Sequence, residues 1–342
     1  MLTQKRVREA VRLLDDQKNI YKENHPAKKV DWKTYEEKYF YRLQKAIFGY
    51  KYFIEKIVLE IEFVKTETRG AKPKLTLEEK CLLLLLKELI QKSNREMSLM
   101  MLLFGVLTGK IVSYKTIERL YSDNEVEIVF ENLHSFLINQ RRGDEIDLSG
   151  DGTGYSLIIS KHYASIAANL KDKAKENKNI KRGFPKKKKR KKIFVYAFNL
   201  VDLKSRMYIS YGTSFRSEKD AYNKAVRMLR KLEINIKSVR LDRYYSGKGT
   251  TQFWKNVQCY LIPKKNVTLK NSGYDWKDML KLFVDDTQNY LFEYFKRNQS
   301  ESCFSEDKRR FGWMIKQKRL DRIDRAIFAR MIWHNLFWLK SS

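Results

Sequence analysis

Residues 294–312 read YFKRNQSESCFSEDKRRFG and set Tyr294, Arg297, Glu301 and Lys308 at successive steps of three, four and seven residues. Residues at these spacings share one face of an α-helix, so one helix is predicted to present all four side chains in a line. A carboxylate flanked by cationic groups suits a metal ligand next to side chains that hold phosphates. The alternative interpretation is a solvated helix face with internal salt bridges, such as Arg297 with Glu301.

Two aspartates lie upstream in strand-like sequence. Asp151 ends the predicted strand EIDLSGD (145–151), where Gly152 and Gly154 predict a sharp turn. Asp242 ends a second predicted strand, SVRLD (238–242). Carboxylates at the ends of neighbouring strands would converge, and two aspartates with a late glutamate can hold a pair of divalent metals for phosphodiester chemistry. Asp147 is a rival for Asp151 and is less favoured, because Asp151 lies in the glycine turn.

The spacing Tyr-x2-Arg-x3-Glu-x6-Lys resembles the signature of prokaryotic insertion-sequence transposases with an RNase H-like DDE catalytic domain. The chain order of the carboxylates is similar too, and the resemblance covers about residues 140–340. It implies that Asp151, Asp242 and Glu301 are the catalytic residues and the ligands of two Mg²⁺ ions, for which Mn²⁺ substitutes. It also implies DNA-handling roles for a group of basic and aromatic residues in the signature, Tyr294, Arg297, Lys308 and the adjacent Arg309. Some relatives carry a large β-rich insertion before the glutamate, but here 59 residues separate Asp242 from Glu301 and leave room only for a short excursion.

The resemblance implies a function as well. It implies cleavage of DNA strands at the ends of an insertion sequence and transfer of those strands into target DNA. The implied partners are double-stranded DNA, as terminal repeats and as target, and a second copy of the chain on that DNA, in the nucleoid-containing cytoplasm of a prokaryote. Two alternatives stay open: an RNase H-like metal-dependent nuclease that cuts without joining, and a non-catalytic DNA-binding protein derived from such an enzyme. An RNA-binding protein is disfavoured, since neither an RNP-like nor a KH-like pattern occurs.

The composition points to a polyanionic partner. The formal net charge is +30, from 71 Lys and Arg residues against 41 Asp and Glu residues in 342. Nucleic acid is the usual partner of such a chain, and a basic protein that stays soluble or touches membranes is the alternative. Residues 181–192, KRGFPKKKKRKK, fall in a predicted surface loop at about 170–192. We expect its central basic residues to contact the DNA backbone without reading sequence, unless the loop is merely solvated; they are Lys186, Lys187, Lys188, Lys189 and Arg190.

Cysteine spacing and hydropathy argue against a zinc protein, a disulfide-linked protein and a membrane-spanning protein. The three cysteines form no CxxC pair and do not cluster with the four histidines, so neither a zinc site nor a disulfide framework is expected. The apolar runs 81–90 and 97–109 are too short to span a bilayer and predict buried helices. The charged, amphipathic start of the chain does not resemble a signal peptide.

The N-terminal part is predicted to be helical. An apolar stripe from Trp32 to Ile61 predicts a helix of about thirty residues, which packs in the core or, less favoured, forms a dimer seam. Residues 76–123 resemble a helix-turn-helix region whose last helix, 113–122, presents Lys115 and Arg119 to DNA. A plain three-helix packing unit fits this pattern equally well.

The predicted architecture is therefore α/β, an RNase H-like mixed sheet flanked by helices and preceded by an all-α DNA-binding region. The predicted division is a helical segment over 1–70 with a dimerisation role, a helix-turn-helix-like region over 71–140 and a catalytic domain over 141–342. Within the last part the patterns predict a hairpin (193–202 and 207–214), a helix (217–232), a strand (259–265) and a closing amphipathic helix (322–339). Among four aromatic residues that could stack on a flipped base, Trp276 is favoured over Trp313, Tyr244 and Tyr245.

Overall fold

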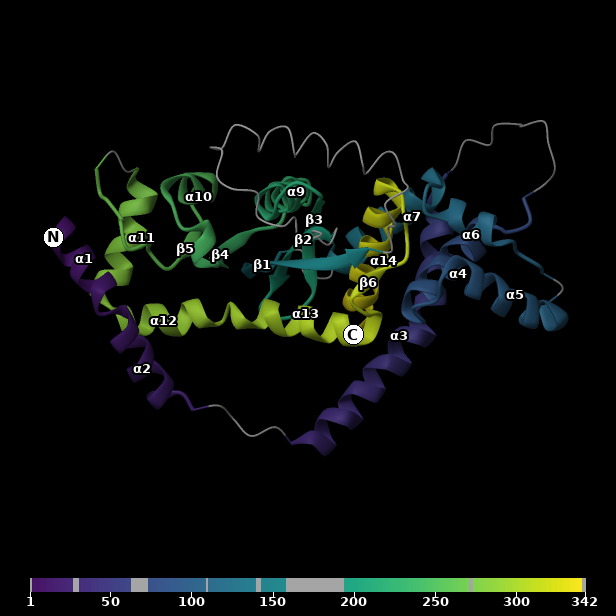
Figure 1. Cartoon of the computed structure of the whole chain (residues 1–342), viewed down its shortest axis with the longest axis horizontal. Coiled ribbons are helices and arrows are strands. Elements are labelled where there is room, and N and C mark those ends of the chain that lie inside the picture. Colours follow the sequence, from purple (N-terminus) through teal and green to yellow (C-terminus); the bar gives the residue numbers. More distant parts are fainter. Residues whose placement is uncertain are drawn as a thin grey trace, which may run out of the picture.

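A computed structural model of the chain describes residues 2–26, 31–62, 73–108, 110–139, 143–157, 194–270 and 273–339. In these ranges, no helix has both the length and the apolar character needed to cross a membrane. The basic run that includes Lys186 lies outside them. The chain has mixed α/β architecture, with a helical N-terminal region followed by a sheet and its covering helices (Figure 1).

A mixed sheet forms the centre of the C-terminal part. Its strand order is β3-β2-β1-β4-β5, and β6 pairs with the far end of β1. β2 and β3 are antiparallel to their neighbours, whereas β4, β5 and β6 run parallel to theirs. The strands are β1 (Ile146–Leu157), β2 (Phe194–Asp202), β3 (Tyr208–Ser214), β4 (Ile236–Leu241), β5 (Gln258–Tyr260) and β6 (Met314–Ile315).

The first strand is longer than the sequence predicted, and the turn expected at Asp151 is absent. β1 continues through Gly152 and Gly154, which pair with Phe198 and Tyr196 of β2. The glycines made a turn look favourable, but antiparallel pairing with β2 keeps this segment extended. The parallel pairing of β1 with β4 nevertheless stops at Gly150, so Asp151 still lies just beyond the last pair of that ladder.

Local sequence patterns correctly predicted most of the elements that follow β1. The predicted hairpin is β2 and β3, and the predicted helix is α9 (Glu218–Arg230), whose N-cap Ser217 accepts a hydrogen bond from the amide of Asp220. The strand before Asp242 is confirmed as β4. The strand expected over 259–265 is shorter, because β5 covers only Gln258–Tyr260. α10 (Lys248–Phe253) lies between β4 and β5.

Helices cover both faces of the sheet. α9 packs on one face, against β1, β2 and β3, while α13 (Asn298–Phe311) packs on the other, against β1 and β2 (Figure 1). α12 (Thr287–Phe295) leads into α13 along the same line, and α11 (Tyr274–Asp285) packs near β5. The sheet therefore lies between two layers of helices, which bury its apolar residues on both faces.

A close approach of backbones joins α9 to β3. A Cβ atom added at Gly212 of β3 would overlap the carbonyl oxygen of Ala221 and lie 2.6 Å from the amide nitrogen of Ala225. Both are backbone atoms of α9, so a side chain at this position can be accommodated only by moving the helix away from the sheet.

Gly212→Ala is therefore expected to lower the free energy of unfolding by at least about 3 kcal/mol, measured by urea denaturation. Gly249→Ala in α10 is the matched control, because its Cβ would meet no atom within 4 Å. That variant is expected to be as stable as the wild type or slightly more so. A loss below about 1 kcal/mol for Gly212→Ala would contradict the predicted clash.

The last helix is a central element instead of an amphipathic cover. α14 (Leu320–Trp338) is buried along nearly its whole circumference, including the charged residues Arg325 and Arg330. Helices α3 (Trp32–Glu60), α4 (Leu77–Leu89) and α7 (Asn124–Asn139) pack around it, together with β3 and α13. The amphipathic prediction was wrong because the N-terminal helices cover the polar side that a surface helix would leave to solvent.

The remaining N-terminal helices are distributed over both ends of the molecule. α1 (Gln4–Arg12) and α2 (Leu14–Asn24) contact α11 and α12, far from the α3–α7 bundle (Figure 1). α6 (Tyr114–Leu120) packs against α4, and α5 (Asn94–Thr108) packs against α6. A capping box starts α4, with Thr76 and Glu79 exchanging hydrogen bonds.

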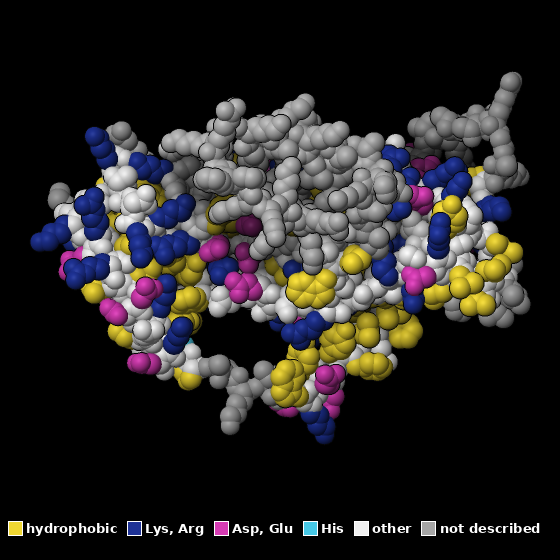
Figure 2. Space-filling view, in the orientation of Figure 1, with side chains coloured by type: hydrophobic (Ala, Val, Ile, Leu, Met, Phe, Trp, Pro, Cys, Tyr) yellow, Lys and Arg dark blue, Asp and Glu magenta, His cyan; other side chains and the backbone are white. Residues whose placement is uncertain are grey.

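The apolar N-terminal helices are only partly buried. Ala46, Ile54 and Ile57 of α3 join the core as predicted, whereas Trp32 is 64% exposed. The run 81–90 is buried in α4, but the helix expected to be buried at 97–109 is α5, which exposes Leu99, Leu102 and Leu103. Figure 2 shows hydrophobic side chains gathered over α3 and α5. The hydrophobicity of a helix did not by itself predict whether another element would pack over its apolar residues.

Candidate active site

The two predicted aspartates lie side by side at the end of the β1–β4 ladder. Gly150 and Leu241 form its last pair, so Asp151 and Asp242 are the next residues on the two strands. Side chains alternate along a strand, which places Asp151 on the face of β1 that also carries Ser149. The Ser149 hydroxyl donates to the Arg297 carbonyl oxygen at 3.0 Å, so this face is the one covered by α13.

Arg297 links the first aspartate to the glutamate. Its guanidinium donates to Asp151 Oδ2 at 3.4 Å and to Glu301 Oε1 at 2.7 Å. The Arg297 and Asp151 side chains are 13% and 17% exposed, whereas that of Glu301 is 53% exposed. The Arg297 Nε has no hydrogen-bond partner within the described ranges. One buried cation therefore holds together carboxylates that lie 150 residues apart in the chain.

The signature residues come from two helices instead of the single helix predicted. α12 ends at Phe295 and α13 begins at Asn298, with Arg297 as its N-cap residue. The Tyr294 ring still lies 5.9 Å from the Arg297 guanidinium, because the two helices continue along one line. Tyr294 itself is buried at 5% exposure. The break brings the Arg297 carbonyl oxygen to Ser149, a contact that spacing along one helix does not suggest.

Negative charge accumulates around Asp151. Burial raises the pKa of this carboxyl to about 6, and the neighbouring Glu301 and Asp242 carboxylates act in the same direction. Arg297 and a hydrogen bond from the Gly152 amide act against this rise. Three carboxylates therefore lie near one guanidinium, which leaves excess negative charge whenever all three are ionised. A site of this kind favours a further cation.

The donor chemistry fits a hard divalent metal. Carboxylate oxygens are the ligands that Mg²⁺ prefers, and the Asp242 and Glu301 carboxylates lie near enough to Asp151 to raise its pKa. In the described part of the chain, however, no three His, Cys, Asp or Glu side chains already surround a common point. Arg297 pairs with two of the three carboxylates instead, so metal binding would require this guanidinium to release them.

Lys308 lies further along the same strand face. Its ammonium donates to the hydroxyl of Thr153, two residues beyond Asp151 on β1. The same ammonium lies 4.4 Å from the centre of the Trp313 ring, and burial lowers its pKa. Arg309 instead points along the surface, where it donates to the Ser305 hydroxyl. Cationic groups thus continue from the carboxylates toward Trp313.

The aromatic residues are placed differently from the prediction. Trp276 is 4% exposed, and its indole N–H donates to the Thr268 carbonyl oxygen, so its ring has no free face for a base. Tyr245 is also buried, whereas Tyr244 and Trp313 are 57% and 65% exposed. The preference for Trp276 was wrong because the α11 helix that carries it packs into the core. Trp313 is the exposed aromatic residue that contacts Lys308.

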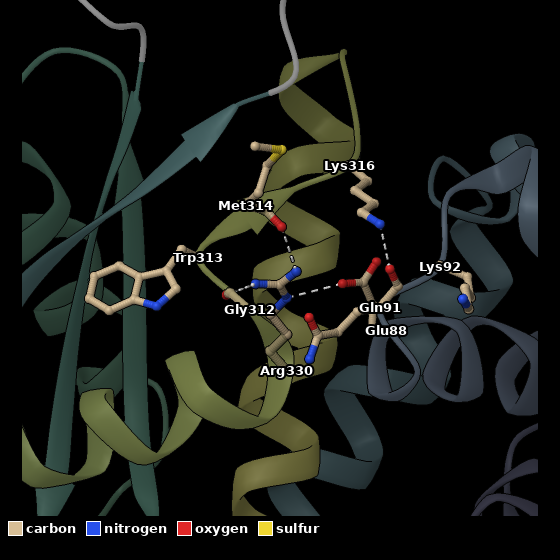
Figure 3. A pocket seen from close by; sticks show the side chains of 8 residues that line it. All are labelled: Glu88, Gln91, Lys92, Gly312, Trp313, Met314, Lys316 and Arg330. Atoms are coloured by element: carbon tan, nitrogen blue, oxygen red, sulfur yellow. Dashed lines mark hydrogen bonds and ion pairs between the residues drawn. The ribbon is translucent and has the colours of Figure 1, made fainter.

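Trp313 borders a small cavity between α4 and β6. The cavity has a volume of about 80 Å³, and Figure 3 shows Arg330 at its base, bonded to Glu88 and to the carbonyl oxygens of Gly312 and Met314. The Trp313 indole is turned toward the strands, on the side away from Lys92 (Figure 3). This arrangement fixes the chain that leads from α13 to α14 and leaves the indole exposed.

Asp147, the rival of Asp151, and the other carboxylates close to Glu301 in the sequence have other partners. Asp147 contacts Ser238 and Arg240. Glu306 pairs with Arg206, and the buried Asp307 accepts hydrogen bonds from Tyr208 and His334. Asp285 pairs with Arg6, and Asp286 caps α12. None of these contacts involves Asp151, Asp242 or Glu301.

The predicted DNA-binding residues outside this site lie elsewhere. Lys115 and Arg119 are exposed on α6, while Ile117 and Leu120 are buried, as expected for a helix with one solvent face. Lys186, Lys187, Lys188, Lys189 and Arg190 fall outside the described residues. Figure 2 shows further Lys and Arg side chains gathered over the end of the molecule that contains α10 and α11.

Clustered carboxylates beside exposed and half-buried cations are typical of enzymes that act on phosphodiesters. No family model and no solved structure matches this chain. The chain is 43% identical over 279 residues to the probable transposase for insertion sequence element ISA1214 of Archaeoglobus fulgidus, covering 81% of this chain and 80% of that protein. The chain therefore belongs to the insertion-sequence transposases.

Proposed function

We propose that this transposase is a DDE enzyme, in which Asp151, Asp242 and Glu301 form the catalytic centre on an RNase H-like sheet. The observation that carries the proposal is the bridge from Arg297 to both Asp151 and Glu301, beside the strand end that bears Asp242. The substrate is double-stranded DNA, at the ends of the element and in the target. Family membership and the charge of +30 both support a DNA substrate.

The three carboxylates of Asp151, Asp242 and Glu301 would together hold two Mg²⁺ ions. When bound, the ions would activate the attacking water or 3′-hydroxyl and stabilise the leaving oxygen. Mn²⁺ would substitute for Mg²⁺, because it prefers the same oxygen ligands. The negative charge around Asp151, which Arg297 only partly compensates, supports this assignment.

The cationic side chains would hold the DNA. The Arg297 guanidinium lies beside the carboxylates and would pair with a phosphate oxygen of the strand to be cut once it releases Asp151 and Glu301. Lys308 would hold the next phosphate along β1, with Tyr294 supporting the Arg297 guanidinium and Arg309 adding charge at the surface. The exposed Trp313 takes the role considered for Trp276, as the aromatic surface on which a base can stack.

Contacts away from the site would align the DNA. Lys115 and Arg119 on α6 would bind the element end, and the basic residues 186–190 would hold its backbone without reading sequence. Two copies of the chain would act together, one on each end of the element.

Joining of strands tests the proposed function. Labelled duplexes with the sequences that flank this gene would be incubated with the protein, Mg²⁺ and an unlabelled plasmid. Cut ends and covalent transfer of the label into the plasmid are expected. Cutting without transfer would indicate a nuclease, and binding without cutting in either Mg²⁺ or Mn²⁺ would indicate a non-catalytic DNA-binding protein.

A further inference from the structure

One further carboxylate contacts the chain next to Asp151 from the opposite face of the sheet. Glu218 is the first residue of α9, and its side chain lies against Gly152. A Cβ atom added at Gly152 would lie 2.6 Å from Glu218 Oε1, so the glycine leaves the space that this side chain fills. Gly152 is therefore needed for contact with Glu218 and not for a turn.

The same carboxylate contacts the segment that follows Asp242. Glu218 Oε1 accepts a hydrogen bond from the Tyr245 hydroxyl at 2.7 Å, and Tyr245 is 6% exposed. Tyr245 ends the short 3₁₀ helix Arg243–Tyr245, of which Asp242 is the N-cap residue. The Asp242 carboxylate accepts a hydrogen bond from the Arg243 amide, so the geometry of this turn fixes where that carboxylate points.

These contacts extend the connection between the two strands beyond their backbone ladder. The pairing of β1 with β4 ends at Gly150 and Leu241, one residue before each aspartate. Past that point, Glu218 packs against the residue after Asp151 and bonds to the turn after Asp242. Functional side chains must be held within about 0.5 Å of their working geometry, and pairing between β1 and β4 no longer ensures this past Gly150 and Leu241.

We propose that Glu218 is a positioning residue, which through Tyr245 sets the separation of the Asp151 and Asp242 carboxylates from the α9 face of the sheet. This inference rests on the proposed metal centre. Glu218 acts through the backbone of residues 152 and 242–245, whereas Arg297 acts on the opposite face, directly on the carboxylates. Glu218 acts by accepting the hydrogen bond from Tyr245, and its negative charge is not required.

Mn²⁺ binding to the full-length protein tests this inference. Five variants would be titrated: Glu218→Ala, Glu218→Gln, Tyr245→Phe, the double variant Glu218→Ala/Tyr245→Phe and, as the matched control, Asp220→Ala. Asp220 lies in the same first turn of α9 and pairs with Lys224, so the control removes a similar charge without touching Gly152 or Tyr245. The readouts are the Mn²⁺ dissociation constant by electron paramagnetic resonance, the Mg²⁺ concentration for half-maximal DNA cleavage, and the melting temperature.

Glu218→Ala and Tyr245→Phe are each expected to raise the Mn²⁺ dissociation constant and the half-maximal Mg²⁺ concentration by about 10- to 100-fold, as losses of supporting contacts in metal sites do. The double variant should bind Mn²⁺ no more weakly than Glu218→Ala alone, because both changes break the same hydrogen bond. Glu218→Gln keeps an acceptor for Tyr245 and should bind Mn²⁺ within about threefold of wild type, as should Asp220→Ala.

Unchanged Mn²⁺ affinity in both Glu218→Ala and Tyr245→Phe would overturn the inference, whatever their melting temperatures. An equal loss in Asp220→Ala would overturn it too, because a general effect of α9 would then explain the result. The proposed function fails separately, if the wild type does not cut DNA or if Glu301→Gln cuts as fast as the wild type. Wild-type cutting that depends on Glu301 but not on Glu218 would leave the function intact and remove only the positioning role.

Discussion

Glu301→Gln is expected to lower the rate of Mg²⁺-dependent DNA cleavage by at least about a thousandfold, a loss of about 4 kcal/mol of transition-state stabilisation. The amide can still accept the hydrogen bond that Arg297 donates to Glu301 Oε1, so the change removes charge while the local fold is kept. It leaves the proposed metals with two carboxylates. The rate would be measured in single-turnover cleavage of labelled duplex, with DNA affinity measured in parallel and expected to stay within about threefold.

Glu306→Gln is the matched control for this experiment. Glu306 lies five residues further along α13 and pairs with Arg206, away from the aspartates. Its cleavage rate should stay within about tenfold of the wild type, since only a partly exposed ion pair is weakened. A Glu301→Gln enzyme that cuts as fast as the wild type, or a larger loss in Glu306→Gln, would show that the glutamate has been misassigned.

Glu88→Ala is expected to cost about 3–5 kcal/mol of unfolding free energy, because it leaves two buried cations without their shared anion. Glu88 is 3% exposed and lies on α4, where it accepts hydrogen bonds from Lys87 at 3.2 Å, from the Tyr121 hydroxyl at 2.5 Å and from Arg330 Nε at 3.0 Å. Arg330 belongs to α14 and also holds the carbonyl oxygens around Trp313 (Figure 3). This ion cluster connects the N-terminal bundle to the chain segment beside the site.

The pH dependence of stability provides an independent measurement on the same residue. Burial alone would raise the pKa of Glu88, but Lys87 and Arg330 lower it to about 2, below its ordinary value of 4.5. The stabilisation by this carboxylate is therefore complete above pH 4.5 and is lost as the pH falls toward 2. Urea denaturation across this range should show the loss in the wild type and a smaller change in Glu88→Ala.

Glu125→Ala is the surface control for the second prediction. Glu125 pairs with Lys80 at 3.2 Å, but its side chain is 50% exposed. Its removal should cost less than about 1 kcal/mol, as is usual for exposed ion pairs. If Glu88→Ala costs no more than Glu125→Ala, the buried cluster does not stabilise the fold.

Local sequence patterns predicted several elements of the C-terminal part. The hairpin of β2 and β3, the helix α9 and the strand before Asp242 follow from periodicity and capping residues, and all three are present. The proximity of Asp151 to Asp242 was also predictable, since carboxylates that end neighbouring strands meet at one edge of a sheet. Predicting that the two aspartates lie close together therefore required only the knowledge that their strands are neighbours.

Features that depend on distant partners were not predictable. Gly152 indicated a turn, yet its lack of a side chain makes room for Glu218, 66 residues away in the chain. The apolar residues of α5 resemble a buried helix, but no element of the described chain covers Leu103. The core position of Trp276 depends on how α11 packs, which a single sequence does not record.

The contacts of α1 and α2 illustrate the same limit. The N-terminal part was predicted to be helical, but no sequence signal placed α1 and α2 against α11 and α12, more than 250 residues later. Arg6 pairs with Asp285 there, and Gln288 donates to the Gln17 side chain. Long-range pairing of this kind becomes visible only when the fold is assembled.

Counting the metal ions bound at the carboxylates is the most direct test of the proposed catalytic centre. Electron paramagnetic resonance of free Mn²⁺ would be recorded during titration of the wild type, Asp151→Asn and the rival carboxylate variant Asp147→Asn. Two ions should bind to the wild type and to Asp147→Asn, whereas Asp151→Asn, which lacks one of the three proposed ligands, should bind Mn²⁺ at least about tenfold more weakly. Equal Mn²⁺ binding by Asp151→Asn and the wild type would contradict a metal centre built on Asp151, Asp242 and Glu301.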